Sequence, residues 1–465
     1  MNILDYSSFY FVGIKGVAMT SLAQMLLDAG KLVRGSDVEQ AFVTEKKLQD
    51  LAIKIDHFEL PLPKDIDCVV YTAAHQGIDN PQVKWAITQG LPTFSQAEAI
   101  ASLFNQKQGL AVCGVGGKST VSAMITWVLT KIGQDPSFSV GVGNIPGLKK
   151  TGAWTNSQYC VAEADEYVID PYAPQKNQPI IPRFSFLKPA VTVCTNLRYD
   201  HPDVYRNFDH TKQVFKKFFL QTSDYLVVNA DDQELLKLAK ETKLKLVTFG
   251  ENHQADFVLT SYVSNEGITK GSFNYQGENY DLELTIPGKF NLLNALAAIA
   301  AVTPLQPKVL TSHQLHGFKS TARRFENKGL VNGVQCFDDY AHHPNEVKAA
   351  IKAVNDWYPN KRKVFAFQSH TYSRTKQLFN DFINAFADTQ QIVMIDIFSS
   401  AREQNDPTIS SDLLCQKIKE KYPQIEAKNL KNIKNLASFF KSSLKPGDVF
   451  VTLGAGDIYE VYDLL

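Results

Sequence analysis

A glycine-rich segment at residues 114–120 has the residue types and spacing that most directly indicate chemistry. It reads Gly-Val-Gly-Gly-Lys-Ser-Thr and follows the apolar run 110–113. Glycines let backbone N–H groups approach phosphate oxygens, a helix that starts here adds the positive end of its dipole, and a lysine and a hydroxyl can reach terminal phosphates and Mg²⁺. A glycine turn that binds no phosphate is the alternative, and the Lys-Ser-Thr at its end argues against it. We therefore predict a nucleotide phosphate site built from Gly114, Gly116, Gly117, Lys118, Ser119 and Thr120.

Two groups of acidic residues lie downstream of this loop, each after a strand-like run. The first holds Glu163, Asp165 and Glu166, and the second holds Asp200, His201 and Asp203. Hard oxygen ligands with one imidazole beside a phosphate loop suit Mg²⁺ bound to ATP. Clustered acids are more often only solvated, but their place at strand ends in a phosphate-loop domain favours metal binding.

The N-terminal segment is typical of a dinucleotide-binding fold. A strand-like run over 9–12 is joined to a helical stretch by a turn holding Gly13 and Gly16, and a second strand ends just before Asp37. The match to GxGxxG is imperfect, so a glycine turn that merely packs helix on strand is an equal alternative. If a diphosphate binds here, Asp37 is placed to meet a ribose hydroxyl.

Two further polar segments, 337–347 and 367–375, directly follow apolar strands near the C-terminus, and Arg323 with Arg324 precedes them. Lone histidines are usually structural. Here several polar side chains share matching strand-end positions, where they can hold an anion and a nucleophile. The residues are Tyr340, His342, His343, His370 and Arg374.

Alternation of short β-branched runs with amphipathic helical stretches predicts an α/β protein with mainly parallel sheets. The 465 residues correspond to about three domains at about 150 residues each. We expect a Rossmann-like domain over 1–106, a central phosphate-loop domain over 107–321 and a second Rossmann-like domain over 322–465. Turn residues alternate with strand-like residues over 261–288, which predicts a small antiparallel insertion. The apolar stretch 292–302 fits a buried helix.

Composition narrows the partners. Lys plus Arg and Asp plus Glu both number 48, so a strongly basic surface for nucleic acid or anionic lipid is not expected, and small molecules are the expected partners. The start of the chain lacks a basic signal-peptide region, and no apolar run reaches membrane-spanning length. The six cysteines are scattered without CxxC or zinc spacing, which predicts buried thiols. We expect a cytoplasmic protein that is a monomer or a homodimer.

Taken in order, the segments resemble the Mur ligase family over essentially the whole chain. GIKGVAMTSLA, GSD and DNPQV are similar to its UDP-binding domain, GVGGKST, AEADE, TNLRYDHPD and FNLLNA to its central ATPase, and RRFE, DDYAHHPNEV, HTYSRT, SSARE and LGAGD to its C-terminal domain. The HHP motif with HxYSRT is similar to the branch that adds L-alanine to UDP-N-acetylmuramate.

This resemblance implies an ADP-forming carboxylate–amine ligase of peptidoglycan precursor synthesis. ATP would phosphorylate the muramate carboxylate, and the alanine amine would attack the acyl phosphate. Lys118 would contact the β and γ phosphates, Ser119 and Glu163 would hold one Mg²⁺, and Glu163 with His201 would hold a second. The resemblance further implies ATP contacts from Asn291, Asn294, Arg324 and Asp339, and an amino-acid pocket of Tyr340, His342, His370 and Arg374.

Several positions depart from the family pattern. Val112 lacks the glycine of a full GxxxxGK[ST] motif, and Val115, Gly116 and Ser119 replace the usual Thr, His and Thr. Phe290 replaces a common His. Ser369 and Thr371 replace Pro and Arg beside His370, which removes one cation from the amino-acid pocket. Other members of the family carry a carbamylated lysine after the DH motif, and Lys216 has a plausible spacing from His201 along the sequence. The alanine-adding branch generally lacks this modification.

Two alternatives therefore stay open. One is a murein peptide ligase, or a ligase of this type for another small amino acid. The other is a non-catalytic sensor of UDP-muramyl species, motivated by the altered loop, although such a protein need not keep Lys118, a hydroxyl at 119, Glu163 and His201.

Overall fold

The computed structural model describes residues 2–40, 42–201, 203–310, 314–399 and 405–465. The SSARE motif noted above lies largely outside these ranges. The chain forms two compact units. The first comprises Met1–Ser261, Gly271–Leu282 and Leu293–Phe318, and the second comprises Tyr262–Lys270, Glu283–Leu292 and Lys319–Leu465.

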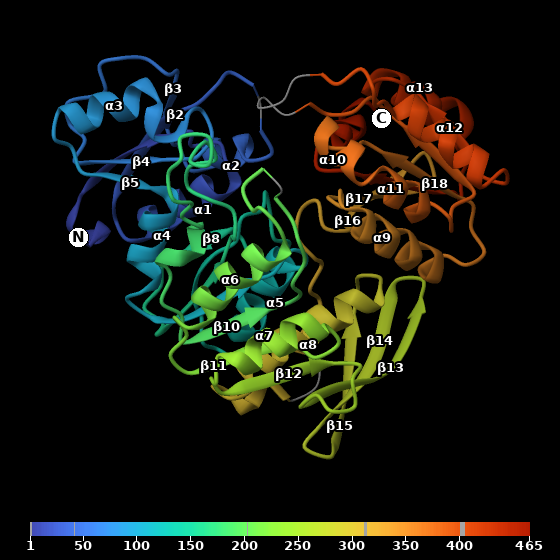
Figure 1. Cartoon of the computed structure of the whole chain (residues 1–465), viewed down its shortest axis with the longest axis horizontal. Helices are drawn as coiled ribbons and strands as arrows, with labels where there is room; N and C mark the ends of the chain where they lie inside the picture. Colours follow the sequence, from blue (N-terminus) through green and yellow to red (C-terminus); the bar gives the residue numbers. More distant parts are fainter. Residues whose placement is uncertain (1, 41, 202, 311–313, 400–404) are drawn as a thin grey trace. The chain divides into compact units, whose positions relative to one another are not determined.

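The first unit begins with a five-stranded parallel sheet of order β3-β2-β1-β4-β5 (Figure 1). Its strands are β1 (Ser8–Val12), β2 (Leu32–Ser36), β3 (Ile55–Asp56), β4 (Cys68–Tyr71) and β5 (Thr93–Ser95). Its helices are α1 (Val17–Asp28), α2 (Glu45–Asp50), α3 (Pro81–Thr88) and α4 (Gln96–Phe104).

Side chains of β1 alternate between the two faces of this sheet, as a doubly wound fold requires. Phe9 and Phe11 pack with residues of α1 and α4. Tyr10 and Val12 pack on the other face with residues of α3. Because both faces are covered, β1 is buried throughout and appears in the sequence as a continuous apolar run.

The second sheet has ten strands in the order β15-β14-β13-β12-β11-β10-β6-β9-β7-β8. The strands are β6 (Gln108–Cys113), β7 (Ser137–Ser139), β8 (Gly152–Ala153), β9 (Tyr159–Glu163), β10 (Val191–Cys194), β11 (Tyr225–Asn229), β12 (Leu246–Gly250), β13 (Phe257–Asn265), β14 (Ile268–Tyr275) and β15 (Glu278–Leu284). The helices are α5 (Lys118–Lys131), α6 (Phe208–Phe219), α7 (Gln233–Glu241) and α8 (Lys289–Val302). Strands β9, β6, β10, β11 and β12 pair in parallel, so their carboxyl ends share one edge.

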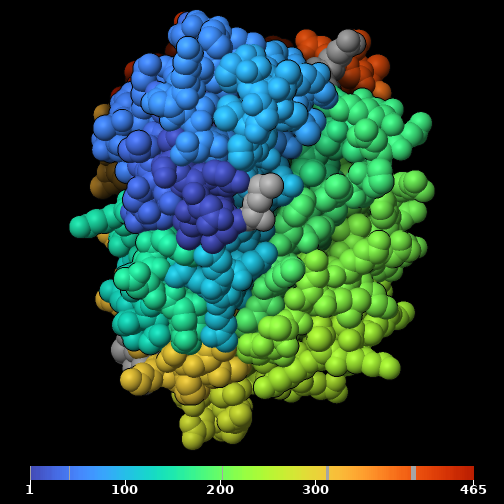
Figure 2. All heavy atoms as spheres, turned by 90° about the vertical axis from the view of Figure 1, so that its left-hand side faces the viewer, coloured from blue at the N-terminus to red at the C-terminus, as the bar shows by residue number. Residues whose placement is uncertain are grey.

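The N-terminal sheet and the ten-stranded sheet are joined by direct packing within the first unit. Ser21 and Ser139 hydroxyls lie 2.8 Å apart, and the Gln24 amide donates to the Thr151 hydroxyl at 2.9 Å. Figure 2 shows the blue N-terminal residues in continuous contact with the cyan and green residues that follow them. The two sheets therefore form one body.

The predicted β insertion is confirmed as strands β13 to β15. Residues 276–277 alone separate β14 from β15, and neighbouring strands joined by so short a turn run antiparallel. Gln276 and Gly277 both have positive φ, 54° and 87°, which is the geometry that two-residue hairpins favour.

The second unit contains a six-stranded sheet of order β16-β17-β21-β18-β19-β20, parallel except for the β16–β17 hairpin. Its strands are β16 (Glu326–Val331), β17 (Val334–Asp339), β18 (Lys363–Phe367), β19 (Gln391–Met394), β20 (Glu426–Asn429) and β21 (Val449–Leu453). Its helices are α9 (Pro344–Trp357), α10 (Tyr372–Gln377), α11 (Phe379–Ala385), α12 (Ser411–Lys421) and α13 (Ile433–Ser443). Apolar clusters lie on both faces of the sheet, so this fold is also doubly wound.

Three further expectations are confirmed. The chain is an α/β protein with mainly parallel sheets. The stretch 292–302 belongs to α8, and its residues from Ala295 to Val302 are buried. All six cysteines are free and buried. Within the described ranges, no helix has the length and apolar character needed to cross a membrane.

Candidate functional site

The glycine-rich loop connects the end of β6 to the start of α5, as the sequence predicts. Gly114 has φ 120° and Gly117 has φ 88°, conformations that strain any residue with a side chain. A Cβ at Gly114 would also lie 2.3 Å from the Thr195 hydroxyl. Lys118, Ser119 and Thr120 form the first turn of α5, where backbone N–H groups and the helix dipole favour an anion.

The amide side chain of Asn196 holds this loop in place. Its Oδ1 accepts from the N–H groups of Val115 and Gly116 at 3.0 and 3.1 Å, and its Nδ2 donates to the Gly116 carbonyl at 2.9 Å. The Thr195 hydroxyl also donates to the Gly116 carbonyl, at 2.5 Å. The first part of the loop is therefore fixed from β10, which leaves the start of α5 to meet phosphate.

Lys118 is held by Glu166, a carboxylate of the first predicted acidic group, which here pairs with the lysine. Its Nζ lies 3.1 Å from Oε2 of Glu166 and donates to the Gly114 carbonyl at 2.8 Å. Burial alone would lower the pKa of Lys118, but Glu166, Asp165 and Glu163 raise it above its usual value. The lysine therefore stays charged at the mouth of the loop.

Glu163 ends β9, next to β6, and Ser119 lies in the first turn of α5. Oε1 of Glu163 accepts from the N–H of Gly141 at 2.7 Å, which fixes the direction of the carboxylate. Mg²⁺ at such sites takes one or two protein oxygens and completes its shell with phosphates and water. A carboxylate and a hydroxyl beside the loop fit that donor set. The described residues include no cluster of three or more His, Cys, Asp or Glu side chains arranged to hold a metal by themselves.

His201 lies against two carboxylates, those of Glu166 and Asp200. Its Nε2 is 3.4 Å from Oε1 of Glu166 and 3.6 Å from Oδ2 of Asp200. Burial would lower the pKa of His201, but these two carboxylates raise it above its usual value. The residue has φ 59°, a costly conformation that tends to persist at functional sites.

Asn294 lies beside the loop, since a Cβ at Gly117 would be 2.8 Å from its Oδ1. Asn291, one turn earlier on α8, donates through Nδ2 to the Pro287 carbonyl at 2.7 Å.

Lys216 is on α6, where its Nζ pairs with Glu241 at 2.8 Å.

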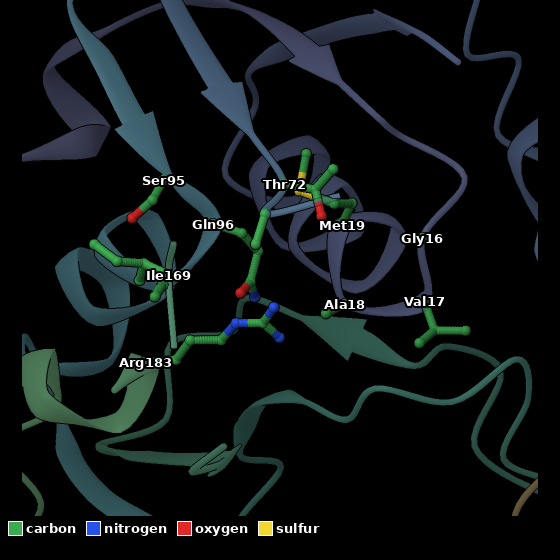
Figure 3. Close-up of a pocket in the computed structure, with 11 residues that line it drawn as sticks. Gly16, Val17, Ala18, Met19, Thr72, Ser95, Gln96, Ile169 and Arg183 are labelled. Carbon is green, nitrogen blue, oxygen red and sulfur yellow. The ribbon is translucent and has the colours of Figure 1, made fainter. Parts of the chain in front are cut away.

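The N-terminal sheet supplies a pocket of about 190 Å³ at the start of α1. Gly16 to Met19, the start of α4 and Arg183 line it (Figure 3). Gly13 lies near this pocket, in the turn before α1, with φ 87°, and a Cβ there would lie 2.4 Å from Thr72. Asp37 is buried and accepts from the N–H of Lys15 at 2.7 Å and of Val38 at 2.8 Å. Its carboxylate therefore already fixes the turn that follows β1.

The polar residues of the second unit gather at the carboxyl ends of β17 and β18. Arg324 lies over the Tyr340 ring with its guanidinium carbon 5.0 Å from the ring centroid. Asp339 accepts from the N–H groups of Ala341 and Phe325 at 2.7 and 2.8 Å. Burial raises the pKa of Asp339 to about 6 although Arg324 opposes the shift. The neighbouring Arg323 instead donates to two carbonyls of the 454–456 loop and pairs with Asp338, so it has a structural role.

His342 belongs to the same cluster. Its Nδ1 lies 3.0 Å from the Tyr340 carbonyl and 3.4 Å from Glu346, and its ring centroid lies 6.4 Å from that of His370. Burial lowers the pKa of His342 to about 4, with the positive charges of Arg374 and Arg324 adding to the effect. His342 is therefore neutral near pH 7. Because a carbonyl only accepts, Nδ1 carries the hydrogen and Nε2 is left as an acceptor.

Thr371 begins the short helix α10, which carries Arg374. It has φ 69° although it is β-branched, and its N–H donates to the Phe398 carbonyl at 2.9 Å. The ring of His370 stacks on Phe398 at 5.6 Å. These contacts hold the start of the HTYSRT segment against Phe398.

The structure brings together two sets of predicted residues, each within its own unit. One surrounds the glycine-rich loop and the other surrounds Arg324 and His342. Sequence reasoning left out Asn196, Arg183 and Glu346 as site residues. Asn196 could have been found because it lies just past a buried strand beside the phosphate-loop strand, whereas Arg183 follows a long irregular segment and gives no such signal.

Comparison with known proteins agrees with this geometry. Residues 8–108 match the Mur ligase family catalytic domain, 112–302 the Mur ligase middle domain and 323–456 the Mur ligase glutamate ligase domain. The chain belongs to the Mur ligase family.

Curated relatives match over nearly the full length. The UDP-N-acetylmuramate–L-alanine ligase of Clostridium novyi is 36% identical, covering 98% of this chain and 96% of the relative. The enzyme of the same name from Acetivibrio thermocellus is 35% identical, covering 100% and 97%. The crystal structure of UDP-N-acetylmuramate-alanine ligase from Thermotoga maritima matches with a TM-score of 0.80 at 25% identity, covering 99% and 98%.

Removing the Asn196 amide should weaken nucleotide binding more than it slows chemistry. In Asn196→Ala the loop loses the hydrogen bonds that hold it in place, so part of the binding energy of ATP must be spent on ordering the loop. We therefore expect the KM for ATP to rise about tenfold, which is the size of effect expected when a few hydrogen bonds of small net energy are lost. The KM for the sugar nucleotide should stay within about twofold. Steady-state kinetics check this, with Asn207→Ala as a control that removes a side-chain bond to the His210 N–H elsewhere in the same unit. Equal changes in both KM values would contradict it.

Asp339 should give the second unit a distinctive pH dependence. Between about pH 4 and 6 the folded chain keeps a proton on Asp339 that the unfolded chain releases, so this group makes the free energy of unfolding fall as pH rises. The Asp339→Asn variant has no ionisable carboxyl group at this position. The free energy of unfolding of this variant minus that of the wild type should therefore grow by about 2.4 kcal/mol from pH 4 to pH 7, since a unit of pKa corresponds to about 1.4 kcal/mol. Denaturant unfolding measures it, and a pH-independent difference would contradict it.

Proposed function

We propose that this protein joins L-alanine to the carboxylate of UDP-N-acetylmuramate, with ATP converted to ADP and phosphate through an acyl phosphate. The observation that carries the proposal is Lys118, charged and held by Glu166 at the mouth of a rigid glycine-rich loop. The full-length similarity to relatives that bear this name supports the choice of substrates. We assign UDP-sugar binding to 1–106, ATP binding to 107–321 and amino-acid binding to 322–465.

In this proposal Lys118 neutralises charge that develops on the transferring phosphoryl group. Ser119 and Glu163 would hold one Mg²⁺ and His201 would join Glu163 at a second, and the bound metal would supply positive charge to the reacting phosphates. Gly114, Gly116, Gly117 and Thr120 complete the phosphate site, and Asn291, Asn294, Arg324 and Asp339 complete the nucleotide site.

The amino acid must arrive with its carboxylate held and its amine free of the extra proton. Arg374 is the proposed partner of the carboxylate, because a planar guanidinium matches two carboxylate oxygens. His342 is neutral, so its Nε2 can accept a hydrogen bond from the amine and orient it for attack. Tyr340 and His370 would flank the same pocket, while Gly13, Gly16 and Asp37 would contribute to sugar-nucleotide binding.

The alternatives differ in readily measured ways. A murein peptide ligase would accept a preformed peptide in place of free alanine. This alternative is motivated by Thr371, which stands where relatives usually have an arginine. A non-catalytic sensor would bind UDP-muramyl species without releasing phosphate. Retention of Lys118, a hydroxyl at 119, Glu163 and His201 argues against the sensor, because a non-catalytic binder need not keep every catalytic group.

Phosphate release tests the proposal directly. With UDP-N-acetylmuramate, ATP and Mg²⁺, we expect release that depends on L-alanine. Lys118→Ala and Glu163→Gln should each lower turnover by about two to three powers of ten, as loss of a preorganised charged contact does, without unfolding the chain. Circular dichroism controls for folding. Near-normal turnover of folded Lys118→Ala would show that the loop assignment is wrong, and use of a tripeptide with no response to alanine would favour the peptide ligase.

The amino-acid site should respond separately from the ATP site. Arg374→Ala should raise KM for L-alanine by about ten- to a hundredfold, the cost of one charge-assisted contact, and change KM for ATP much less. Thr371→Arg should lower KM for L-alanine, and its unbranched Cβ suits φ 69° better than threonine. Lys376→Ala, which removes an exposed lysine of the same helix paired with Asp406, is the matched control. An unchanged alanine KM in Arg374→Ala would remove Arg374 from the pocket.

A further inference from the structure

Arg183 is a charged residue that has no role in the reaction proposed above. It begins the short 3₁₀ helix Arg183–Phe186, and it lines the pocket formed by the starts of α1 and α4. In Figure 3 its guanidinium extends into this pocket, beneath the Gln96 side chain and to the left of Ala18. Arg183 therefore supplies the positive charge among the residues that line the pocket.

An ion pair fixes the position of this guanidinium. Its Nη1 donates to Oδ2 of Asp165 at 2.6 Å, and the backbone N–H of Arg183 donates to the Tyr167 carbonyl at 2.9 Å. A guanidinium has five N–H groups in a rigid fork, so one bond to Asp165 leaves donors that can face the pocket.

The ion pair also places Arg183 on the ATP side of the pocket. Asp165 follows Glu163 by two residues, and its charge acts on Lys118 of the glycine-rich loop. A group bound by Arg183 thus lies next to the segment that carries the proposed phosphoryl-transfer residues. The rest of the lining comes from Gly16 to Met19, Thr72, Ala73, Ser95 to Ala97 and Ile169.

We propose that Arg183 is a substrate-binding residue that recognises the sugar-borne carboxylate of the UDP-muramyl substrate and holds it at the edge of the ATP site. This inference rests on the function proposed above and adds to it the residue that selects for the carboxylate. The group to be phosphorylated is a planar anion, and a guanidinium fork binds such a group through two parallel hydrogen bonds. Asp165 positions the fork and takes no part in the contact.

Binding of two sugar nucleotides separates the possibilities. Isothermal titration of the full chain with UDP-N-acetylmuramate and with UDP-N-acetylglucosamine compares ligands that share the nucleotide, diphosphate and sugar but differ in the carboxylate-bearing group. Arg183→Gln should weaken binding of UDP-N-acetylmuramate by about ten- to a hundredfold, the range of a charge-assisted contact, and change binding of UDP-N-acetylglucosamine less than about twofold. Arg183→Lys should give an intermediate loss, since it keeps the charge without the fork.

Two control variants test a merely structural role. Asp165→Asn removes the ion pair but leaves the guanidinium, and should weaken UDP-N-acetylmuramate far less than Arg183→Gln does. Arg198→Gln breaks a similar 2.6 Å ion pair, with Asp232, in the same unit and should change neither affinity. Thermal unfolding of each variant confirms that it is folded.

Three results would overturn the inference. Equal weakening of both sugar nucleotides by Arg183→Gln would assign Arg183 to the diphosphate. The same loss in Asp165→Asn as in Arg183→Gln would assign Arg183 to the support of Asp165. Retained preference for UDP-N-acetylmuramate in folded Arg183→Gln would place carboxylate recognition elsewhere and leave the proposed function intact, whereas a wild-type chain without that preference would overturn the proposed function itself.

Discussion

A lysine that is mostly buried next to a phosphate site must keep its charge before any phosphate arrives, and this requirement organises the centre of the first unit. Glu166 supplies the nearby negative charge, at 3.1 Å from Lys118. The same carboxylate lies 3.4 Å from His201, so one acidic side chain stabilises a cation from the loop and an imidazole from the strand end after β10. Glu166 therefore supplies negative charge to Lys118 and His201 together.

In the second unit, the proposed role requires a neutral side chain instead of a charged one. The imidazole of His342 is kept neutral by burial and by the positive charges of two nearby arginines. Glu346 accepts from the N–H groups of His342 and His343 and so caps the start of α9. Burial lowers the pKa of a histidine and raises that of a carboxyl group, and both effects occur within this cluster, at His342 and Asp339.

Much of this arrangement is predictable because strand ends, glycine turns and helix starts have strong local signals. The glycine-rich loop, the antiparallel insertion over 261–288 and the helix over 292–302 follow from sequence alone. The direction of a side chain does not. Asp37 has the position of a ribose ligand in the sequence, yet in the structure it binds two backbone N–H groups. Arg183 is 18 residues from Asp165 along the chain, so only the folded path of the intervening segment brings them together.

The burial of every cysteine has a practical consequence for experiments on motion. A thiol reacts with maleimides and similar reagents as the thiolate, and only where the reagent can reach it. All six thiols are buried, and burial raises the pKa of Cys68, Cys160, Cys336 and Cys415 to about 12. A single cysteine introduced on the surface of each unit would therefore accept a fluorophore or spin label, while the native thiols would not react with the reagent. The distance between the two units can thus be followed during turnover without first building a cysteine-free background.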